Sequence, residues 1–343
     1  MRKLRVLVLV TEGLEPPETV EGLSDEEIIK APWKTEYDVV VTLKELGHEV
    51  RVLAIYSDLG ALRKEIEGWK PHIAFNLLEE YAGISLYDQN VVTFLELVNV
   101  PYTGCNPKGM MIARDKALSK KLLAYHRIRV PAFAVFPYGR RIRRPKRLTY
   151  PIFVKSALED ASYGISQASL VKDDESLAER VAFVHQQTGA DAIAEGFIEG
   201  RELYVGVIGN RRLEVLPVWE LFFDKKPENA PLIATAAAKW NLKYQKRWGV
   251  TSRAARGLPE DFVRRIEHRC KRIYRVLGLS GYARLDFRLT PEGRLYFLEA
   301  NPNPALSYGE DFAESAEKKG VSYHHLIQRI LNLGLRWKPL QMV

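Results

Sequence analysis

The chain has 343 residues, and 46% of them are hydrophobic, which is enough to bury cores in two or three subdomains. Its formal net charge is +8, which raises the question of nucleic-acid binding. No run of eighteen apolar residues occurs, and the first apolar stretch leads into acidic, proline-containing sequence, so we expect a cytoplasmic protein with neither a membrane span nor a signal peptide.

The first hundred residues alternate between apolar, strand-like runs and helical stretches. The pattern predicts strands at 4–10, 49–55 and 72–78 and helices near 36–46 and 87–98. Alternating strands and helices indicate a parallel, doubly wound sheet. The segment VPYTGCNP (100–107) closes this unit.

Two lysines in the next part of the chain occupy different structural settings. Lys116 begins an amphipathic helix in ARDKALSKKLL, where a lysine is usually only solvated. Lys155 ends the apolar strand YPIFVKS (150–156), and the small-residue loop EDASYGIS (159–166) follows. Backbone N–H groups of such a loop can close over phosphate groups. The strand lysine and the loop together therefore indicate a phosphate site better than either does alone.

A helix is expected at 174–187, and the segment DAIAEGFIEGRE (191–202) follows it. This segment carries Glu195 and Glu202 in a strand-like setting and continues into the apolar run RELYVGVIGN (201–210). A strand with exposed glutamates is the alternative to a binding segment here.

The most informative stretch is GYARLDFRLTPEGRLYFLEANPNP, residues 281–304. Two β-rich runs, 282–290 and 294–300, are separated by Pro-Glu-Gly, and together they predict a hairpin. Side chains alternate between the two faces of a strand. Residues two apart on either strand are therefore expected to share a face.

That alternation brings Arg284 together with Asp286, and Glu299 together with Asn301. Magnesium prefers hard oxygen ligands, usually one or two carboxylates, and takes the rest of its shell from water and substrate phosphates. The two acids and the amide fit that demand, while Arg284 can stabilise charge that develops on a transferring group. A solvated hairpin held by salt bridges is the alternative.

The order of these motifs resembles the ATP-grasp superfamily, and specifically its D-alanine:D-alanine ligase-like branch. The resemblance extends over nearly the whole chain and is firmest from Lys116 to Pro304. It implies an N-terminal doubly wound parallel α/β domain followed by two α+β subdomains that clasp ATP. The boundaries expected from it are 1–107, 108–200 and 201–343.

The resemblance also implies roles for individual residues. ATP, with Mg2+ or Mn2+, is the implied cofactor, and Asp286, Glu299 and Asn301 are the implied metal ligands. Glu195 would accept a hydrogen bond from the adenine amino group, and Glu202 would bind the ribose hydroxyl groups. The other residues implied at the nucleotide and phosphates are Lys116, Lys155, Phe197 and Ile198, Ser162 of the loop, and Lys239 of AAAKWNLKY (236–244).

The chemistry that the resemblance implies has two steps. A substrate carboxylate attacks the γ-phosphate of ATP to give an acylphosphate, and an amine then displaces phosphate to form an amide. Arg284 would stabilise the tetrahedral adduct of the second step. No protein nucleophile is needed. The partners are thus a small carboxylate and a small amine, with a homodimer as the assembly that is habitual in the family.

Several positions depart from the family pattern, and they all lie where substrates would bind. TEGLEPPE (11–18) lacks the usual Gly-Gly-x-Ser-x-Glu, Glu79 and Glu80 replace His-Gly, and Ala161 replaces the first loop serine. Trp240 replaces a tyrosine, Ala305 a glycine, and Glu310 with Asp311 stands where a serine holds the second carboxylate. We therefore expect substrates other than two D-alanines, with Glu310 or Asp311 as counter-charge to a cationic amine. Simple capping of a helix by both acids is the alternative.

Other readings of the whole chain stay open at this point. They are a D-alanine–D-alanine ligase of peptidoglycan synthesis, an ATP-grasp kinase, and a non-catalytic nucleotide binder. The basic run GRRIRRPKRL (139–148) lacks interleaved aromatic residues and is expected to be a solvated surface connection, so we expect no nucleic-acid partner. Cys105 and Cys270 are expected to be buried thiols, because neither has a second cysteine nearby.

Overall fold

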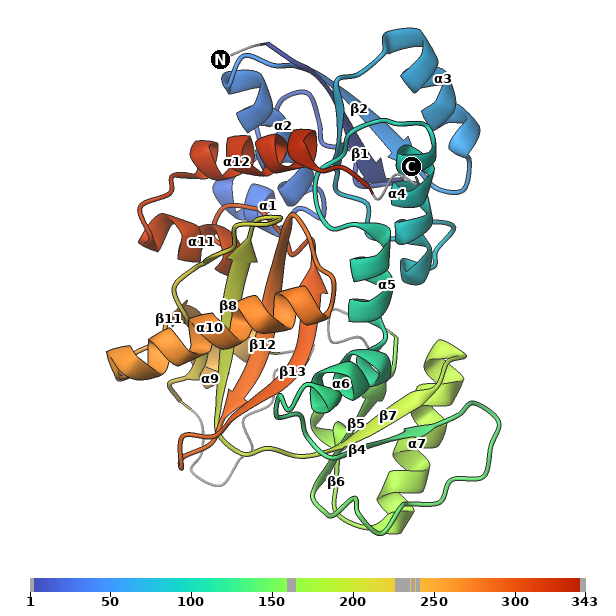
Figure 1. The fold of residues 1–343 in the computed structure, drawn as a ribbon, viewed down its shortest axis with the longest axis vertical. Coiled ribbons are helices and arrows are strands. Elements are labelled where there is room, and N and C mark those ends of the chain that lie inside the picture. The colour runs from blue at the N-terminus through green and yellow to red at the C-terminus, as the bar shows by residue number, and fades with distance from the viewer. Residues whose placement is uncertain (1–2, 159–164, 226–234, 236–237, 239–240, 340–343) are drawn as a thin grey trace.

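The computed structural model describes residues 3–158, 165–225, 235, 238 and 241–339 (Figure 1). The chain forms three separate sheets. Along the long axis of the molecule, the N-terminal part comes first, the sheet within residues 201–302 second, and the sheet within residues 133–196 third. Within the described residues, no helix is long and apolar enough to cross a membrane.

The N-terminal sheet is parallel and has the order β2-β1-β3, as the alternating pattern predicted. Its strands are β1 (Arg5–Thr11), β2 (Glu49–Ile55) and β3 (Ile73–Asn76). The helices of this part are α1 (Asp25–Lys30), α2 (Lys34–Glu45), α3 (Leu59–Trp69) and α4 (Asp88–Leu97), with a 3-10 turn η1 (Ser85–Tyr87). A parallel sheet buries both faces, and β1 is accordingly buried along almost its whole length.

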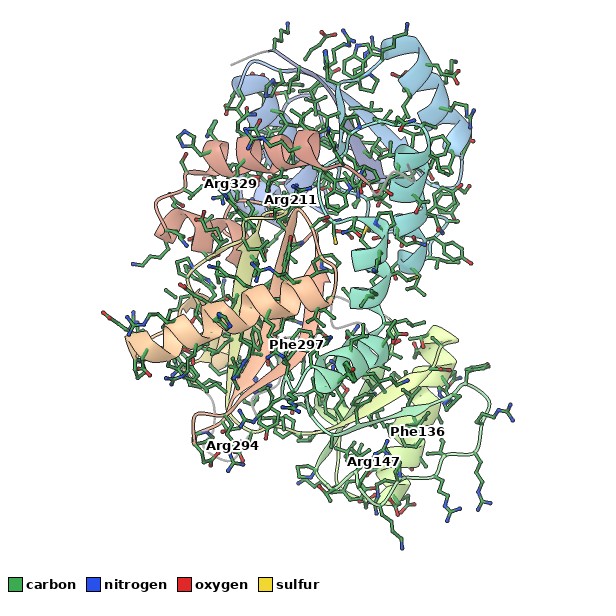
Figure 2. The ribbon with its side chains drawn as sticks, in the orientation of Figure 1. Phe136, Arg147, Arg211, Arg294, Phe297 and Arg329 are labelled. Atoms are coloured by element: carbon green, nitrogen blue, oxygen red, sulfur yellow. The ribbon has the colours of Figure 1, made fainter. Side chains whose placement is uncertain are left out.

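The second sheet is antiparallel and has the order β4-β7-β5-β6. Its elements are β4 (Phe133–Phe136), β5 (Ile152–Ser156), η2 (Gln167–Ser169), β6 (Leu170–Val171), α7 (Asp174–Thr188) and β7 (Ala192–Gly196). The helices α5 (Pro107–Arg114) and α6 (Lys116–Tyr125) lead into it. The basic run 139–148 connects β4 to β5 and is largely exposed, which confirms that it is a surface connection; Arg147 on it is exposed (Figure 2).

The third sheet is also antiparallel, in the order β11-β10-β8-β12-β13, with β9 paired to β8. Its strands are β8 (Arg201–Ile208), β9 (Glu214–Val215), β10 (Trp219–Phe223), β11 (Val250–Ala254), β12 (Tyr282–Leu289) and β13 (Leu295–Pro302). The helices are α9 (Leu242–Trp248), α10 (Glu260–Val276), α11 (Asp311–Lys318) and α12 (Tyr323–Arg336).

Helix α10 covers one face of the third sheet (Figure 1). The buried residues of α10 include Ile266, Cys270 and Ile273, and they share a core with Phe287 and Phe297 of the hairpin. Spacings of three and four residues place these side chains on one helix face. The buried thiols that we expected for both cysteines are confirmed.

Candidate functional site

The predicted hairpin is formed by β12 and β13, and its register pairs the predicted residues directly. Asp286 is opposite Glu299 and Arg284 is opposite Asn301. Residues that face each other in an antiparallel pair point to the same side of the sheet. All four side chains therefore lie on one face, as the alternation predicted, and this is the face opposite α10.

Arg284 holds Asp286 by two hydrogen bonds. Its Nε and Nη2 donate to Oδ1 and Oδ2 at 2.8 and 3.0 Å, and the Asn301 Nδ2 donates to the same Oδ2 at 3.0 Å. The Arg284 guanidinium also lies 4.8 Å from the Tyr204 ring centre. Burial alone would lower the pKa of Arg284, but Asp286 outweighs it and raises the pKa. Asp286 is 3% exposed, and charge-assisted hydrogen bonds from Arg284 hold its carboxylate in place.

A cluster of lysine and glutamate side chains joins the second sheet to the hairpin. Lys155 Nζ donates to Glu299 Oε2 at 3.0 Å and lies 3.5 Å from Glu195 Oε1. The β5–β7 register pairs Lys155 with Ile193, two residues from Glu195, so both charged side chains share a face. Burial opposes the charge of Lys155, but Glu195 and Glu299 raise its pKa. Lys155 therefore stays cationic where the second sheet meets the hairpin.

Lys120 is the second lysine of this cluster, and the sequence reasoning missed it. Lys120 is 0% exposed, and its Nζ donates a hydrogen bond to the Leu298 carbonyl. The same Nζ lies 3.0 Å from Glu195 Oε1, an ion pair without hydrogen-bond geometry. Burial lowers the pKa of Lys120 to about 8 despite the attraction of Glu195. Burial also opposes the charge of Glu195, but its two lysine partners outweigh this and lower its pKa. Lys120 follows Lys116 by four residues on α6, but this spacing alone does not show which sheet the lysine faces.

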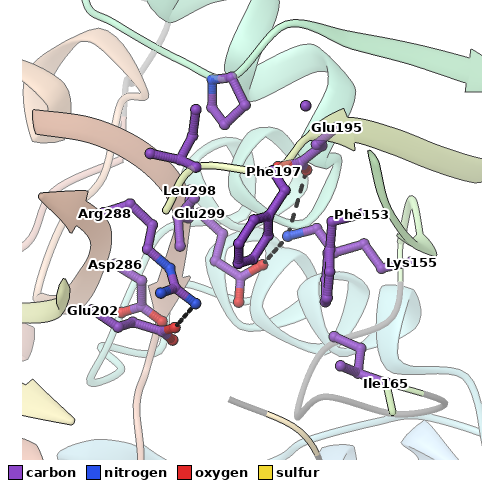
Figure 3. A pocket seen from close by; sticks show the side chains of 13 residues that line it. Phe153, Lys155, Ile165, Glu195, Phe197, Glu202, Asp286, Arg288, Leu298 and Glu299 are labelled. Atoms are coloured by element: carbon purple, nitrogen blue, oxygen red, sulfur yellow. Dashed lines mark hydrogen bonds and ion pairs between the residues drawn. The ribbon is translucent and has the colours of Figure 1, made fainter. Parts of the chain in front are cut away.

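A β-bulge shapes the hairpin at the same place. The register shifts between Asp286 and Phe287, so that Phe287 pairs with Phe297 while Asp286 pairs with Glu299, and Leu298 is the extra residue. A bulge of this kind re-aims side chains next to a site. Leu298 and its neighbour Glu299 consequently both line the same pocket, although adjacent strand residues normally point to opposite faces (Figure 3).

The pocket between the two antiparallel sheets has about 630 Å³ of empty space, including the part open to solvent. Small ligands and cofactors bind in pockets that have apolar walls and a few convergent polar groups, and this pocket has both. Seven predicted residues line it: Lys155, Glu195, Phe197, Ile198, Glu202, Asp286 and Glu299. The apolar walls come from Pro131, Phe153, Ile165, Phe197, Ile198 and Leu298 (Figure 3). The walls suit a flat ring, and the charged end suits phosphates and a cation.

Glu202 has partners that the sequence did not predict. It pairs with Arg288 in the β8–β12 register, with Arg288 Nη2 at 2.7 Å from Oε2, and its Oε1 accepts from the Tyr204 hydroxyl at 2.9 Å. Arg288 also donates to the Gly200 carbonyl. A Cβ at Gly200, where φ is +142°, would stand 2.1 Å from the Leu289 carbonyl oxygen, so only glycine allows this close approach.

Lys116 lies at the first turn of α6 and is 2% exposed rather than solvated. The Asp115 side chain caps the helix by accepting hydrogen bonds from the backbone N–H groups of Ala117 and Leu118. The Lys116 backbone N–H donates to the Ala157 carbonyl, just after β5. Lys116 does not line the pocket. Ser162, Lys239 and Trp240 lie outside the described residues.

None of the predicted substrate residues that the structure describes lines the pocket. Glu79 and Ala305 are exposed. Glu310 is the N-cap residue of α11, without a side-chain cap bond, and Asp311 begins the helix. Asp311 Oδ2 lies 3.9 Å from Arg284 Nη1, so this acid is already placed beside a cation.

Phe153, Arg288 and Leu298 line the pocket without having been predicted. Arg288 continues the face of Arg284 and Asp286 at the next even position, so strand alternation could have identified it. Phe153 likewise shares the face of Lys155, two residues away. No local pattern indicates Leu298, because the bulge decides its direction.

The donor set fits magnesium. In the part of the chain that the structure describes, no group of three or more His, Cys, Asp or Glu side chains could hold a metal ion. Asp286 and Glu299 are two facing carboxylates beside the Asn301 amide, and Mg2+ takes the rest of its shell from water and phosphate oxygens.

Comparisons with known proteins agree with this geometry. The family model described as "D-ala D-ala ligase C-terminus" matches residues 125–332. A D-alanine–D-alanine ligase of Syntrophotalea carbinolica is 30% identical over 314 residues, which cover 90% of this chain and 92% of that protein. The chain belongs to the D-alanine–D-alanine ligase family. It is therefore an ATP-grasp ligase of the carbon–nitrogen bond-forming type, and the family is ATP- and Mg2+-dependent.

Three further proteins show how far the similarity extends. An uncharacterised protein, y4sG, of Sinorhizobium fredii is 31% identical over 324 residues, which cover 89% of each chain. The solved D-alanine–D-alanine ligase of Bacillus anthracis complexed with ATP has a TM-score of 0.73 at 21% identity, covering 97% of this chain and 98% of that one. The VanG D-Ala:D-Ser ligase of Enterococcus faecalis has a TM-score of 0.68 at 19% identity, covering 97% and 100%. These structures confirm the predicted ATP-grasp fold.

Proposed function

We propose that this ligase joins a small carboxylate to a small amine through an acylphosphate, releasing ADP and phosphate, and that its substrates are not two D-alanines. The observation that carries the chemistry is the facing pair Asp286 and Glu299, with Arg284 on one acid and Lys155 on the other. Phosphoryl transfer depends on positioned cations and carboxylates rather than on a protein nucleophile.

The nucleotide site follows from the pocket. The adenine ring would lie between the apolar walls, with its edge at Ile198, because the Phe197 N–H already donates to the Pro151 carbonyl. Glu195 would meet the adenine amino group, and Glu202 the ribose, both while keeping their cationic partners. Lys155 would bind phosphate oxygens from the side of Glu299, and we keep Lys116, Lys239 and Ser162 as further phosphate ligands.

Asp286, Glu299 and Asn301 would hold the metal, which would supply positive charge to neutralise the phosphate groups. Arg284 lies beside these residues and keeps its charge, so it can stabilise the oxyanion of the adduct that forms when the amine attacks. Asp286 would hold the guanidinium in place during this step.

The proposal that the substrates are not two D-alanines is supported by the residues expected at the substrates. Glu79, Trp240, Ala305, Glu310 and Asp311 all depart from the family pattern, and three of the five are acidic. Carboxylates there would repel a second substrate's carboxylate and attract a cation. D-Alanine–D-alanine ligation is the second candidate, because relatives with that name match the chain over about nine-tenths of its length.

The test is to incubate the protein with ATP, magnesium and pooled amino acids, including D-alanine and small diamines. ADP and phosphate release and the masses of new amides are followed together. Release that requires an acid and an amine, with a product mass equal to their sum less water, is the expected result. A stable phosphorylated product without phosphate release would instead make the protein a kinase.

A further inference from the structure

Asn301 lies near the end of an outer strand. β13 is the last strand in the order of the third sheet, and it ends at Pro302. Such a strand has a neighbouring strand on one side only. The Asn303 N–H donates to the Tyr282 carbonyl at 3.3 Å, which is longer than the usual value of about 2.9 Å. The backbone hydrogen bonding therefore becomes weaker just past Asn301.

The side chain of Asn303 supplies a second anchor at this place. Its Oδ1 accepts a hydrogen bond from the Cys105 backbone N–H at 2.8 Å, between residues that are 198 positions apart in the chain. The backbone of Asn303 is left-handed, with a φ of +53°, and asparagine adopts this conformation more readily than most residues do. The hydrogen bond thus joins the end of the hairpin to the segment that leads from the N-terminal part into α5.

Gly104 makes room for this contact. A Cβ at Gly104, where φ is +95°, would stand 2.4 Å from Asn303 Oδ1. Real Cβ atoms do not approach an oxygen so closely, so only glycine allows the asparagine to reach the backbone here. Both sides of the contact therefore depend on their residue type, the glycine for its space and the asparagine for its acceptor.

The segment that receives the Asn303 side chain is itself held on both sides. Thr103 Oγ1 accepts from the N–H of Asn76, the last residue of β3, at 3.0 Å. The Asn106 N–H donates to Ser280 Oγ, shortly before β12, at 2.9 Å. Asn303 therefore ties the strand that carries Asn301 to a part of the chain that is fixed to both the parallel sheet and the hairpin.

The position of Asn301 matters because its amide belongs to the metal-binding group. Asn301 is two residues before Asn303, faces Arg284 across the hairpin, and donates from Nδ2 to Asp286 Oδ2 at 3.0 Å. Magnesium demands nearly ideal octahedral geometry, and residues that orient its ligands affect its affinity. A displaced strand end would move the Asn301 oxygen and weaken the binding of the ion.

We propose that Asn303 is a positioning residue for magnesium binding. Its hydrogen bond to the Cys105 N–H fixes the end of β13 and so places the Asn301 amide beside Asp286. This inference rests on the proposed metal site of Asp286, Glu299 and Asn301. A residue that only stabilised the fold would leave the contribution of magnesium to nucleotide binding unchanged.

The test measures ADP affinity by calorimetry with saturating magnesium and with a chelator. The ratio of the two affinities reports the coupling between metal and nucleotide. Asn303→Gly removes the acceptor and keeps the left-handed conformation accessible. We expect the ratio to be at least about tenfold smaller in Asn303→Gly than in the wild type, with unchanged ADP affinity in the chelator. Asn303→Asp keeps an acceptor oxygen and should retain the wild-type ratio.

Asn99→Gly is the matched control. Asn99 is exposed, follows α4 and also has a left-handed backbone, with a φ of +57°. The same substitution there should leave the ratio as in the wild type. Hydrogen exchange provides a readout without any ligand, because the Cys105 amide should exchange faster in Asn303→Gly and at the wild-type rate in Asn303→Asp.

The outcomes separate this inference from the ligase function. Asn303→Gly with lower stability in urea but a wild-type ratio would overturn the positioning role, and so would an equal loss of the ratio in Asn303→Asp. A wild-type protein that binds ADP equally with and without magnesium would overturn the metal site and this inference with it. The expected loss in Asn303→Gly, together with no amide product from any substrate pair, would sink the ligase proposal and leave the role of Asn303 standing.

Discussion

Asp286 and Glu299 face each other across β12 and β13, and each of them is held by a different cation from a different direction. Arg284, two residues away on the same strand, binds Asp286, while Lys155 from the second sheet reaches Glu299 at 3.0 Å. The pair thus lies where the two antiparallel sheets meet. A nucleotide bound there would contact both sheets at once.

Removing either charge of this pair should abolish turnover. Asp286→Asn and Glu299→Gln each delete a ligand charge for magnesium while keeping the shape of the side chain. Steady-state ADP release should fall by about a hundredfold or more, with an unchanged far-UV circular dichroism spectrum. Glu292→Gln in the exposed turn of the same hairpin is the control and should keep full activity. Normal turnover in both test variants would remove these acids from the metal site.

Lys155→Met should weaken nucleotide binding. The lysine ends β5 in the pocket and stays cationic, so its loss removes a charge-assisted contact with phosphate, worth about 1.5 to 3 kcal/mol. Calorimetric titration with ADP and magnesium should show an affinity reduced by about ten- to a hundredfold. Lys172→Met, at an exposed position after β6, is the matched control. Wild-type affinity in Lys155→Met would exclude this lysine from the phosphate site.

Lys120→Met should destabilise the fold, because it removes one partner of a fully buried ion pair. Glu195 would keep Lys155 at 3.5 Å, and the Leu298 carbonyl would lose its donor. Breaking such a pair costs about 3 to 5 kcal/mol of unfolding free energy, which urea denaturation measures. Lys121→Met, exposed on the next position of α6, should change stability little. Equal stability of the two variants would mean that Lys120 contributes nothing to the cluster.

Glu36→Gln should stabilise the ligand-free protein, and only at high pH. The folded pKa of about 7 lies above the ordinary value of 4.5, so the folded state binds more protons between these values and stability falls as pH rises through this window. The penalty at pH 8 is up to about 3 kcal/mol. Urea denaturation at pH 8 should favour Glu36→Gln, with little difference at pH 4, and Glu21→Gln on the exposed surface serves as the control. A stability difference between Glu36→Gln and the wild type that does not change with pH would contradict the raised pKa of Glu36.

Arg284→Lys should lower turnover without the same loss of nucleotide affinity. Lysine keeps the charge but cannot make the two parallel hydrogen bonds to Asp286. We expect ADP release coupled to amide formation to fall by about a hundredfold or more. Arg294→Lys at the tip of the hairpin, which is exposed (Figure 2), is the control. An affinity loss equal to that of Lys155→Met would move Arg284 from the reaction step to nucleotide binding.

The sequence by itself determined the parallel N-terminal unit and the face of the hairpin that carries Arg284, Asp286, Glu299 and Asn301. Both follow from local periodicity, because a strand turns alternate side chains to alternate faces and a βαβ pattern admits few topologies. The strand position of Lys155 was predictable for the same reason. What could not be predicted were its partners, since Glu195 and Glu299 come from two other strands.

The tertiary structure alone decided the position of Lys120, the direction of Leu298 and the burial of Glu36. Lys120 lies on a helix whose pattern does not say which sheet it packs against, and Leu298 is turned into the pocket by a register shift between two strands. The sequence of α2 gives Glu36 the character of an ordinary helix glutamate, yet it is 2% exposed and lies on the buried face of the helix. Each depends on contacts between segments far apart in the chain, whose closeness is set by packing and not by local propensity.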